Sequence, residues 1–156
     1  MKPNNQLVPF CALNNYQNYN INRGHNTLMI TRFLMYGAIG CLMEVLWTGL
    51  AELKRKNFTL RSTTSLWMFF IYGMVVFIEP VFTLIAPINI ILRGMIYAIL
   101  IMSGEFLTGT LLKRVDVCPW DYSATRFHVR GIVRLDYFPA WMIAGLLFER
   151  IYRVIT

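Results

Sequence analysis

Long apolar blocks alternate with short polar or basic segments along most of the chain. The blocks run over Leu28–Leu53, Leu66–Ala86, Ile88–Leu112 and Phe138–Ile155. A helix of about 20 apolar residues is long enough to cross the hydrocarbon core of a bilayer. The pattern therefore predicts an all-α integral membrane protein, whose four transmembrane helices form a single domain over residues 27–156.

The two halves of this domain repeat the same order of features. Each begins with a helix that carries a glutamate, a Thr-Gly pair and a basic end. These are Glu44, Thr48-Gly49 and Lys54-Arg55 in the first half, and Glu105, Thr108-Gly109 and Lys113-Arg114 in the second. Each half continues with a basic Phe-x-aliphatic-Arg loop and a Trp-Met pair, which start at Phe58 and Trp67, and at Phe127 and Trp141. We expect two pseudo-repeated, parallel helical hairpins, residues 27–84 and 88–155, related by rotation about the membrane normal. Chance similarity between apolar helices is the alternative.

The two embedded glutamates are the leading candidate functional residues. A charged side chain at the bilayer centre costs about 2.5–3.5 kcal/mol on insertion scales, so its presence is by default a functional hypothesis. Helical rise puts Glu44 and Glu105 about 12–15 Å from the basic helix ends, near the membrane midplane. Small residues share a face with each glutamate, so we expect the first and third helices to pack side by side. The pair then binds a proton, a cation or a cationic solute, or protonated carboxyls clamp the helices together. The sequence leaves both interpretations open.

A second charged pair is predicted toward the opposite side of the membrane. Glu79 lies near the end of the second helix, and Arg93 lies near the start of the third, after the Ala86-Pro87 turn. An ion pair between Glu79 and Arg93 would neutralise two charges that are costly to bury alone. We expect this pair to be structural rather than a gate. The other charged residues on this side are interpreted as interfacial anchors, namely Arg32, Glu149, Arg150 and Arg153.

The segment before the last helix, residues 115–137, is too polar to span a membrane but is rich in aromatic residues. Trp and Tyr favour the membrane–water boundary, so we expect an aromatic-rich interfacial loop. Asp121 and Ser123 have the spacing to cap a short helix. The residues that would cover the mouth of the glutamate site are Asp121, Arg126, His128 and Arg130, and Trp120 and Tyr122 are further candidate substrate- or ion-binding residues. The alternative is a loop whose polar residues hold its own turns.

Composition supports a membrane location. Of the 156 residues, 56% are hydrophobic and 15% are charged, an apolar fraction too large for a soluble domain of this size to bury. The net charge of +7 fits basic loops beside anionic lipid headgroups better than nucleic-acid binding. The three cysteines, Cys11, Cys41 and Cys118, show no metal-ligand spacing. We therefore expect no metal, no cofactor and no nucleic-acid partner.

Charge also predicts an orientation. Loops 54–64 and 113–137 carry nine lysines and arginines, against five toward the other side. The positive-inside rule then favours a cell-membrane protein with both loops in the cytoplasm and both termini outside.

Residues 1–26 are polar and lack the features of a signal peptide, so we expect a flexible or surface-lying tail.

The second half of the chain carries motifs of a known family. The stretches GEFLTGTLLKRV, CPWDYS and FHVRGIVRLDYFPAWMIAGLLFERI, within residues 103–151, resemble the family described as putative ABC-transporter type IV, the CmpB-like group, and its eukaryotic relatives named transmembrane protein 229. The matching positions are Glu105, Thr108, Gly109, Trp120, Asp121, Tyr122, Ser123, Arg130, Gly131 and Ile132, with Arg130 and Gly131 in reversed order. The likeness is fainter over residues 33–75, where Gly40 and Glu44 match. No Walker A pattern is present, so the resemblance implies a separate ATPase subunit for any ATP-driven role.

The leading functional interpretation is a permease-like protein with a midplane acidic site for a proton, a cation or a small cationic solute. A four-helix protomer leaves little room for a pathway, so a homo-oligomer in the lipid bilayer is expected. The alternative is a membrane-embedded enzyme acting on lipid or isoprenoid headgroups, with Glu105 and Asp121 as acid/base groups and two arginines holding phosphate. The chain lacks H-E-x-x-H and G-x-S-x-G patterns, which favours a protein that is not an enzyme. A structural or accessory membrane subunit is the third interpretation.

Overall fold

The computed structural model describes the backbone of residues 10–54 and 56–156, and the side chains of residues 26–54 and 56–156. Its helices are α1 (Phe10–Lys54), α2 (Leu66–Gly73), the 3₁₀ helix η1 (Met74–Ile78), α3 (Glu79–Leu84), α4 (Ile90–Arg114), the 3₁₀ helix η2 (Leu135–Tyr137) and α5 (Phe138–Ile155). Two short strands, β1 (His128–Val129) and β2 (Val133–Arg134), pair antiparallel between α4 and α5. The all-α prediction therefore missed one small β-hairpin.

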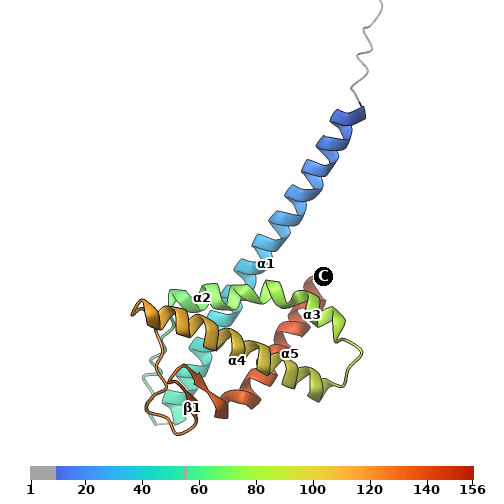
Figure 1. Ribbon diagram of the computed structural model, residues 1–156. Coiled ribbons are helices and arrows are strands. Elements are labelled where there is room, and N and C mark those ends of the chain that lie inside the picture. The colour runs from blue at the N-terminus through green and yellow to red at the C-terminus, as the bar shows by residue number, and fades with distance from the viewer. Residues whose placement is uncertain (1–9, 55) are drawn as a thin grey trace, which may run out of the picture.

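Helix α1 begins earlier than the apolar pattern predicts. It starts at Phe10 rather than Leu28, so residues of the predicted polar tail continue the first helix. Figure 1 shows this N-terminal part of α1 projecting away from the remaining helices. Residues 1–9 of the predicted tail lie outside the described residues.

Within the described part of the chain, three stretches are long and apolar enough to cross a membrane. They are Asn26–Lys54, Leu66–Leu84 and Ile90–Arg114, and they correspond to the first three predicted spans. Helix α5 forms where the fourth span is expected, but it carries Glu149, Arg150 and Arg153 near its end and does not meet the same criterion. The chain is therefore a mostly helical protein suited to a membrane, with three spans supported by length and composition.

The second predicted helix is not a continuous α-helix. The structure divides it into α2, η1 and α3, with the 3₁₀ segment directly before Pro80. Proline has no N–H group and its ring clashes with the carbonyl of the residue four positions earlier, which is Val76 here. Tighter 3₁₀ turns over Met74–Ile78 accommodate this break in the hydrogen-bond ladder.

The helices pack as two hairpins. Helix α1 packs mainly on α2 and η1, and α4 packs mainly on α5. We call α1, α2, η1 and α3 the first hairpin, and α4 and α5 the second hairpin. The prediction that the small residues pack the first helix directly on the third is therefore wrong. Gly37 faces Phe69 on α2, and Gly94 faces Met142 on α5, so each small-residue face serves its own hairpin.

The first helices of both hairpins end in the same way. Two residues beyond each helix, Lys56 and Asp116 adopt positive φ angles of 60° and 54°. In each case the next N–H group reaches back to a carbonyl five residues earlier, from Asn57 to Glu52 (3.0 Å) and from Val117 to Leu112 (3.0 Å). This is the pattern of a Schellman motif, which satisfies carbonyls left free at a helix end.

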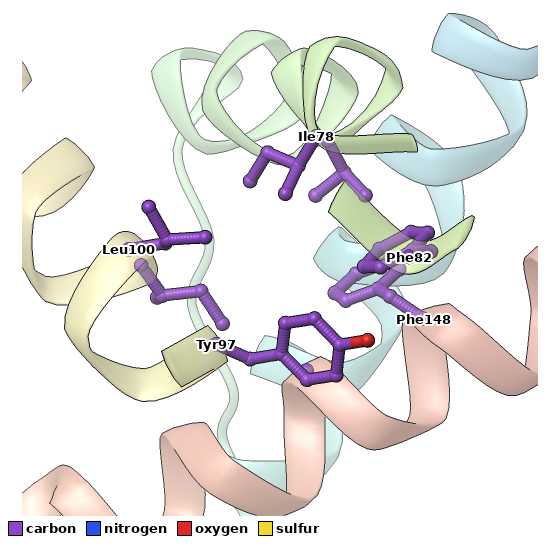
Figure 2. Close-up of a pocket in the computed structure, with 8 residues that line it drawn as sticks. Ile78, Phe82, Tyr97, Leu100 and Phe148 are labelled. Atoms are coloured by element: carbon purple, nitrogen blue, oxygen red, sulfur yellow. The ribbon is translucent and has the colours of Figure 1, made fainter. Parts of the chain in front are cut away.

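The two hairpins meet through aromatic rings. Tyr36 of α1 lies edge-on to Phe148 of α5, with ring centroids 5.8 Å apart, and Phe82 of α3 lies edge-on to Tyr97 of α4 at 5.3 Å. Tyr36, Tyr97 and Phe148 are the largest fully buried side chains among those described. Figure 2 shows Phe82, Tyr97 and Phe148 with Ile78 and Leu100 around a small apolar cavity between the hairpins. The core therefore lies at this junction.

Candidate functional site

Glu44 and Glu105 lie in comparable positions of α1 and α4, but their surroundings differ. Glu44 is partly buried, and its Oε2 accepts a hydrogen bond of 2.5 Å from the hydroxyl of Thr64, which is exposed in the loop before α2. Glu105 is only 8% exposed, and its Oε2 has no hydrogen-bond partner among the described residues. An unpartnered buried carboxylate oxygen is costly, so Glu105 is the less satisfied of the two.

Polar aromatic side chains surround the two glutamates. The Tyr122 hydroxyl and the Trp141 indole lie against the Glu105 carboxyl group, although Nε1 of Trp141 also lacks a hydrogen-bond partner in the described part of the chain. Tyr72 of α2 lies near both Glu44 and Glu105. Burial raises the pKa of Tyr122, and the negative charge of nearby Glu105 raises it further, with a smaller contribution from Glu44. Tyr72 and Tyr122 are thus the side chains that connect the surroundings of both carboxyl groups.

The repeated Thr-Gly pairs have one structural use in both hairpins. The hydroxyls of Thr48 and Thr108 donate to helix carbonyls four residues earlier, at 2.9 and 2.7 Å, and so leave no unpaired polar group. The glycines leave room for the following loop. A Cβ on Gly49 would lie 2.8 Å from the Ser62 hydroxyl, and one on Gly109 would lie 2.4 Å from Ile132. Each loop therefore packs back onto the glutamate-bearing helix one turn after the glutamate.

The motif residues of the second loop hold the loop on α4. The Trp120 indole donates to the Ile132 carbonyl (3.0 Å), and the Tyr122 amide donates to the Gly131 carbonyl (2.9 Å). Gly131 has φ +65°, and a Cβ there would lie 2.2 Å from the Ser123 hydroxyl, so both backbone conformation and space require glycine. The motif residues Trp120 and Gly131 therefore have a structural role, because both are needed to pack the loop.

Asp121 is engaged in the same turn. Its Oδ1 accepts hydrogen bonds from the backbone N–H (3.1 Å) and the hydroxyl (2.6 Å) of Ser123, and it forms an ion pair with Lys113 at 3.3 Å. The Ser123 hydrogen bonds, and then Lys113, hold the pKa of Asp121 below its usual value. No helix follows these residues, so the predicted helix cap is instead a turn stabilised by the aspartate side chain.

Arg126 and Arg130 stack on rings, whereas Arg134 pairs with the Asp136 carboxylate at 2.6 Å. Arg126 lies over Phe127 with its guanidinium carbon 5.6 Å from the ring centroid, and Arg130 lies over Phe106 at 5.9 Å. Arg130 has φ +53°, and the ring nitrogen Nδ1 of His128 accepts from the Gly131 amide at 2.9 Å. Among the described residues, the structure does not join Arg126 or Arg130 with Asp121 in one ion-paired cluster.

The predicted ion pair between Glu79 and Arg93 is wrong. Glu79 instead pairs with Arg32 at 2.9 Å and accepts a hydrogen bond from the Tyr36 hydroxyl at 2.8 Å. Arg93 pairs with Glu149 at 3.4 Å. Sequence proximity to the Ala86-Pro87 turn suggested the pairing, but each charge finds its partner inside its own hairpin. Arg32 and Glu149 are therefore members of ion pairs rather than simple interfacial anchors.

Sequence reasoning missed three neighbours of the glutamates. Thr64 lies in a polar loop with no distinguishing pattern, and Tyr72 is one of many aromatic residues in the second span, so neither carried a signal. Trp141 did carry one, since the Trp-Met pair is repeated, but the repeat marked only the start of a helix. The described residues contain no group of three histidine, cysteine or acidic side chains placed to hold a metal ion.

Comparison with known proteins agrees with the motifs gathered around α4. The model of the family described as "Putative ABC-transporter type IV" matches residues 31–156. The chain belongs to this family. No solved structure matches the chain. The match begins in the apolar part of α1 and covers both hairpins, so it includes the glutamates and the whole of the second loop.

Proposed function

We propose that the protein is a permease-like membrane protein in which Glu44 and Glu105 form an acidic site for a proton, a cation or a small cationic solute. The observation that carries this proposal is the buried Oε2 of Glu105. This oxygen has no hydrogen-bond partner among the residues that the structure describes, and it lies beside Trp141 Nε1, which also lacks one there. A proton or a bound cation would satisfy the carboxylate, and cation–aromatic contact with Tyr122 or Trp141 would add to it.

We further propose that the site opens toward the loops. Thr64 is exposed and holds Glu44, and Tyr122 comes from the second loop to Glu105, so both carboxyl groups are reached from the same side. On this proposal the loop side is cytoplasmic, because it carries most of the flanking lysines and arginines. Tyr72 lies near both glutamates and would therefore link the two carboxyl groups within one site.

An internal duplication underlies the proposal. Its support comes from the shared Schellman ends after α1 and α4, the shared use of Thr-Gly, and the glutamate one turn before each Thr-Gly. On this proposal α5 is the fourth span, and the charges near its end lie at the membrane surface. Two parallel hairpins with one site between them match the arrangement of parallel transporter repeats.

Proton or cation flux through the full-length chain in liposomes tests the proposal. A pH-sensitive dye inside the vesicles reports proton movement when a pH gradient is imposed. We expect the wild-type protein to dissipate the gradient, and Glu105→Gln and Glu44→Gln each to reduce the rate about tenfold or more, as expected for loss of a charged contact. Glu52→Gln is the matched control, because it removes a carboxylate from α1 two turns nearer the loop.

A second role, as a structural or accessory subunit, is favoured by a different observation. Trp120, Asp121, Ser123 and Gly131 all make packing or turn contacts, so much of the motif has a purely structural use. That role becomes the better account if wild-type vesicles hold a gradient as well as empty ones, or if both glutamine variants assemble and retain full flux.

A further inference from the structure

The two hairpins contain matching charged clusters with different degrees of pairing. In the first, Arg32 and Tyr36, one turn apart on α1, both bond to Glu79 on α3, at 2.9 and 2.8 Å. The guanidinium also lies 6.0 Å from the ring of Tyr152. One positive and one negative charge are present, and they pair with each other. The charges of this first cluster are therefore balanced.

The second cluster repeats the chemistry but leaves donors free. Arg93 and Tyr97, again one turn apart, face Glu149 on α5. Here Nε of Arg93 and the hydroxyl of Tyr97 are buried without hydrogen-bond partners among the described residues. One nitrogen of Arg93 donates to the Ala86 carbonyl at 2.9 Å, and Arg153 shares Oε1 of Glu149 with Arg93. The one carboxylate is therefore divided between two arginines.

A cavity of about 220 Å³ lies at this second cluster. It is lined by Ile90, Arg93, Leu146, Glu149, Arg150 and Arg153. The lining therefore holds three arginines and one carboxylate, and Glu149 itself is only 3% exposed. Arg150 is exposed and is not paired with a carboxylate in the described part of the chain. The cavity therefore carries an excess of positive charge and a free arginine, a setting suited to an anion.

We propose that this cavity binds a phosphate group. Guanidinium groups present planar pairs of N–H donors that match phosphate oxygens, and such charge-assisted bonds are stronger than neutral ones. Apolar Ile90 and Leu146 complete the lining, so a phosphate carrying acyl chains fits as well as free phosphate does. The cavity lies about 18 Å along α4 from Glu105, so this site is separate from the proposed acidic site.

Lipid binding to the purified full-length protein tests the inference. Detergent-solubilised protein is titrated with phosphatidylglycerol, and bound lipid is counted by native mass spectrometry. Diacylglycerol with the same acyl chains is the phosphate-free probe, and inorganic phosphate is added as a competitor. We expect phosphatidylglycerol to bind and diacylglycerol not to bind. Arg150→Gln should weaken phosphatidylglycerol binding about tenfold, as expected for one lost charged contact.

Arg114→Gln is the matched control, since it removes the same charge from the opposite end of α4. Arg150 is exposed at the surface of α5, so its replacement leaves the ion pairs of Arg93 and Arg153 in place. Displacement of the lipid by inorganic phosphate identifies free phosphate as the ligand, and its failure to compete identifies a lipid headgroup. Equal binding of diacylglycerol, unchanged binding by Arg150→Gln, or an equal loss in Arg114→Gln overturns the inference.

Discussion

At the scale of single residues, the structure separates side chains that hold the fold from those available for chemistry. Asp121 and Trp120 belong to the first group, because each is tied to the turn that includes Gly131. Glu105 belongs to the second, because its buried Oε2 has no hydrogen-bond partner among the described residues and so costs stability rather than adding to it. Both kinds lie in the same family motifs, so motif membership alone does not distinguish them.

Asp121 gives a prediction about pH. Because its pKa is lowered in the folded protein, its ionised form stabilises the fold above the pKa of the unfolded chain, which is about 3.9, and this stabilisation is lost as pH falls through the lower folded value. Asp121→Asn should therefore lower the melting temperature at neutral pH. The difference from wild type should shrink as the pH falls below about 4. Thermal unfolding in detergent at several pH values measures it.

Asp116→Asn removes the same charge from the same loop and is the control for net charge. The backbone of Asp116 is in the left-handed region, and asparagine also tolerates this conformation. A melting-temperature difference for Asp121→Asn that stays constant between neutral and acidic pH would contradict the assigned role of the Ser123 and Lys113 contacts.

Residue pairing was the weakest part of the sequence prediction. The sequence showed that Glu79 and Arg93 needed partners, because buried charges are costly. It could not show which partners, since Arg32 and Glu149 were assigned to the membrane surface by their distance along the chain. Packing decides the pairing: α1 rests on α2 and η1, and α4 rests on α5, so the charges pair within each hairpin.

At the scale of elements, the apolar pattern predicted the helices well but not their internal breaks or extensions. Hydropathy placed the last two apolar helices within a few residues of the bounds of α4 and α5. It could not locate the start of α1, because the polar residues before Leu28 continue a helix without an apolar signal. The break at η1 follows from Pro80, which the sequence does show, although the extent of the 3₁₀ segment depends on packing.

The loop–helix contacts at Gly109 give a prediction at this scale. Gly109→Ala should destabilise the fold by about 1–3 kcal/mol, because the added methyl overlaps Ile132 in a packed contact. The Cβ added by Gly104→Ala, five residues earlier in the same helix, meets no neighbouring atom within 4 Å. This substitution should be neutral or up to about 1 kcal/mol stabilising, since alanine favours the helix. Denaturant unfolding in mixed micelles compares the two, and an equal effect would show that the loop does not pack there.

At the scale of the whole molecule, the number of spans determines on which side of the membrane Thr156 lies. In the four-span arrangement that we propose, loops 54–64 and 113–137 would share the cytoplasmic side and Thr156 would lie outside. Single cysteines at Phe58, Phe127 and Thr156, all exposed in the structure, test this in a variant without native cysteines. An impermeant maleimide added to intact cells should label only the cysteine at position 156.

The same experiment in opened membranes is the control, since all three cysteines should then react. Equal labelling of all three positions in intact cells, whether all react or none does, would leave the chain with three spans and would remove the parallel arrangement of the hairpins. The duplication and the site between the hairpins would then need a different geometry.

The ring contacts between Tyr36 and Phe148 and between Phe82 and Tyr97 bear on how such a molecule could move. Edge-on rings hold their attraction over a range of offsets, whereas a hydrogen bond is lost once its angle fails. The charged clusters, by contrast, bind helices within each hairpin. In a shear motion between the hairpins, each hairpin would therefore stay rigid while the aromatic rings slide past one another. The energy barrier to this motion would depend on the shapes of the packed side chains, because no hydrogen bond or ion pair between the helices of one hairpin needs to break.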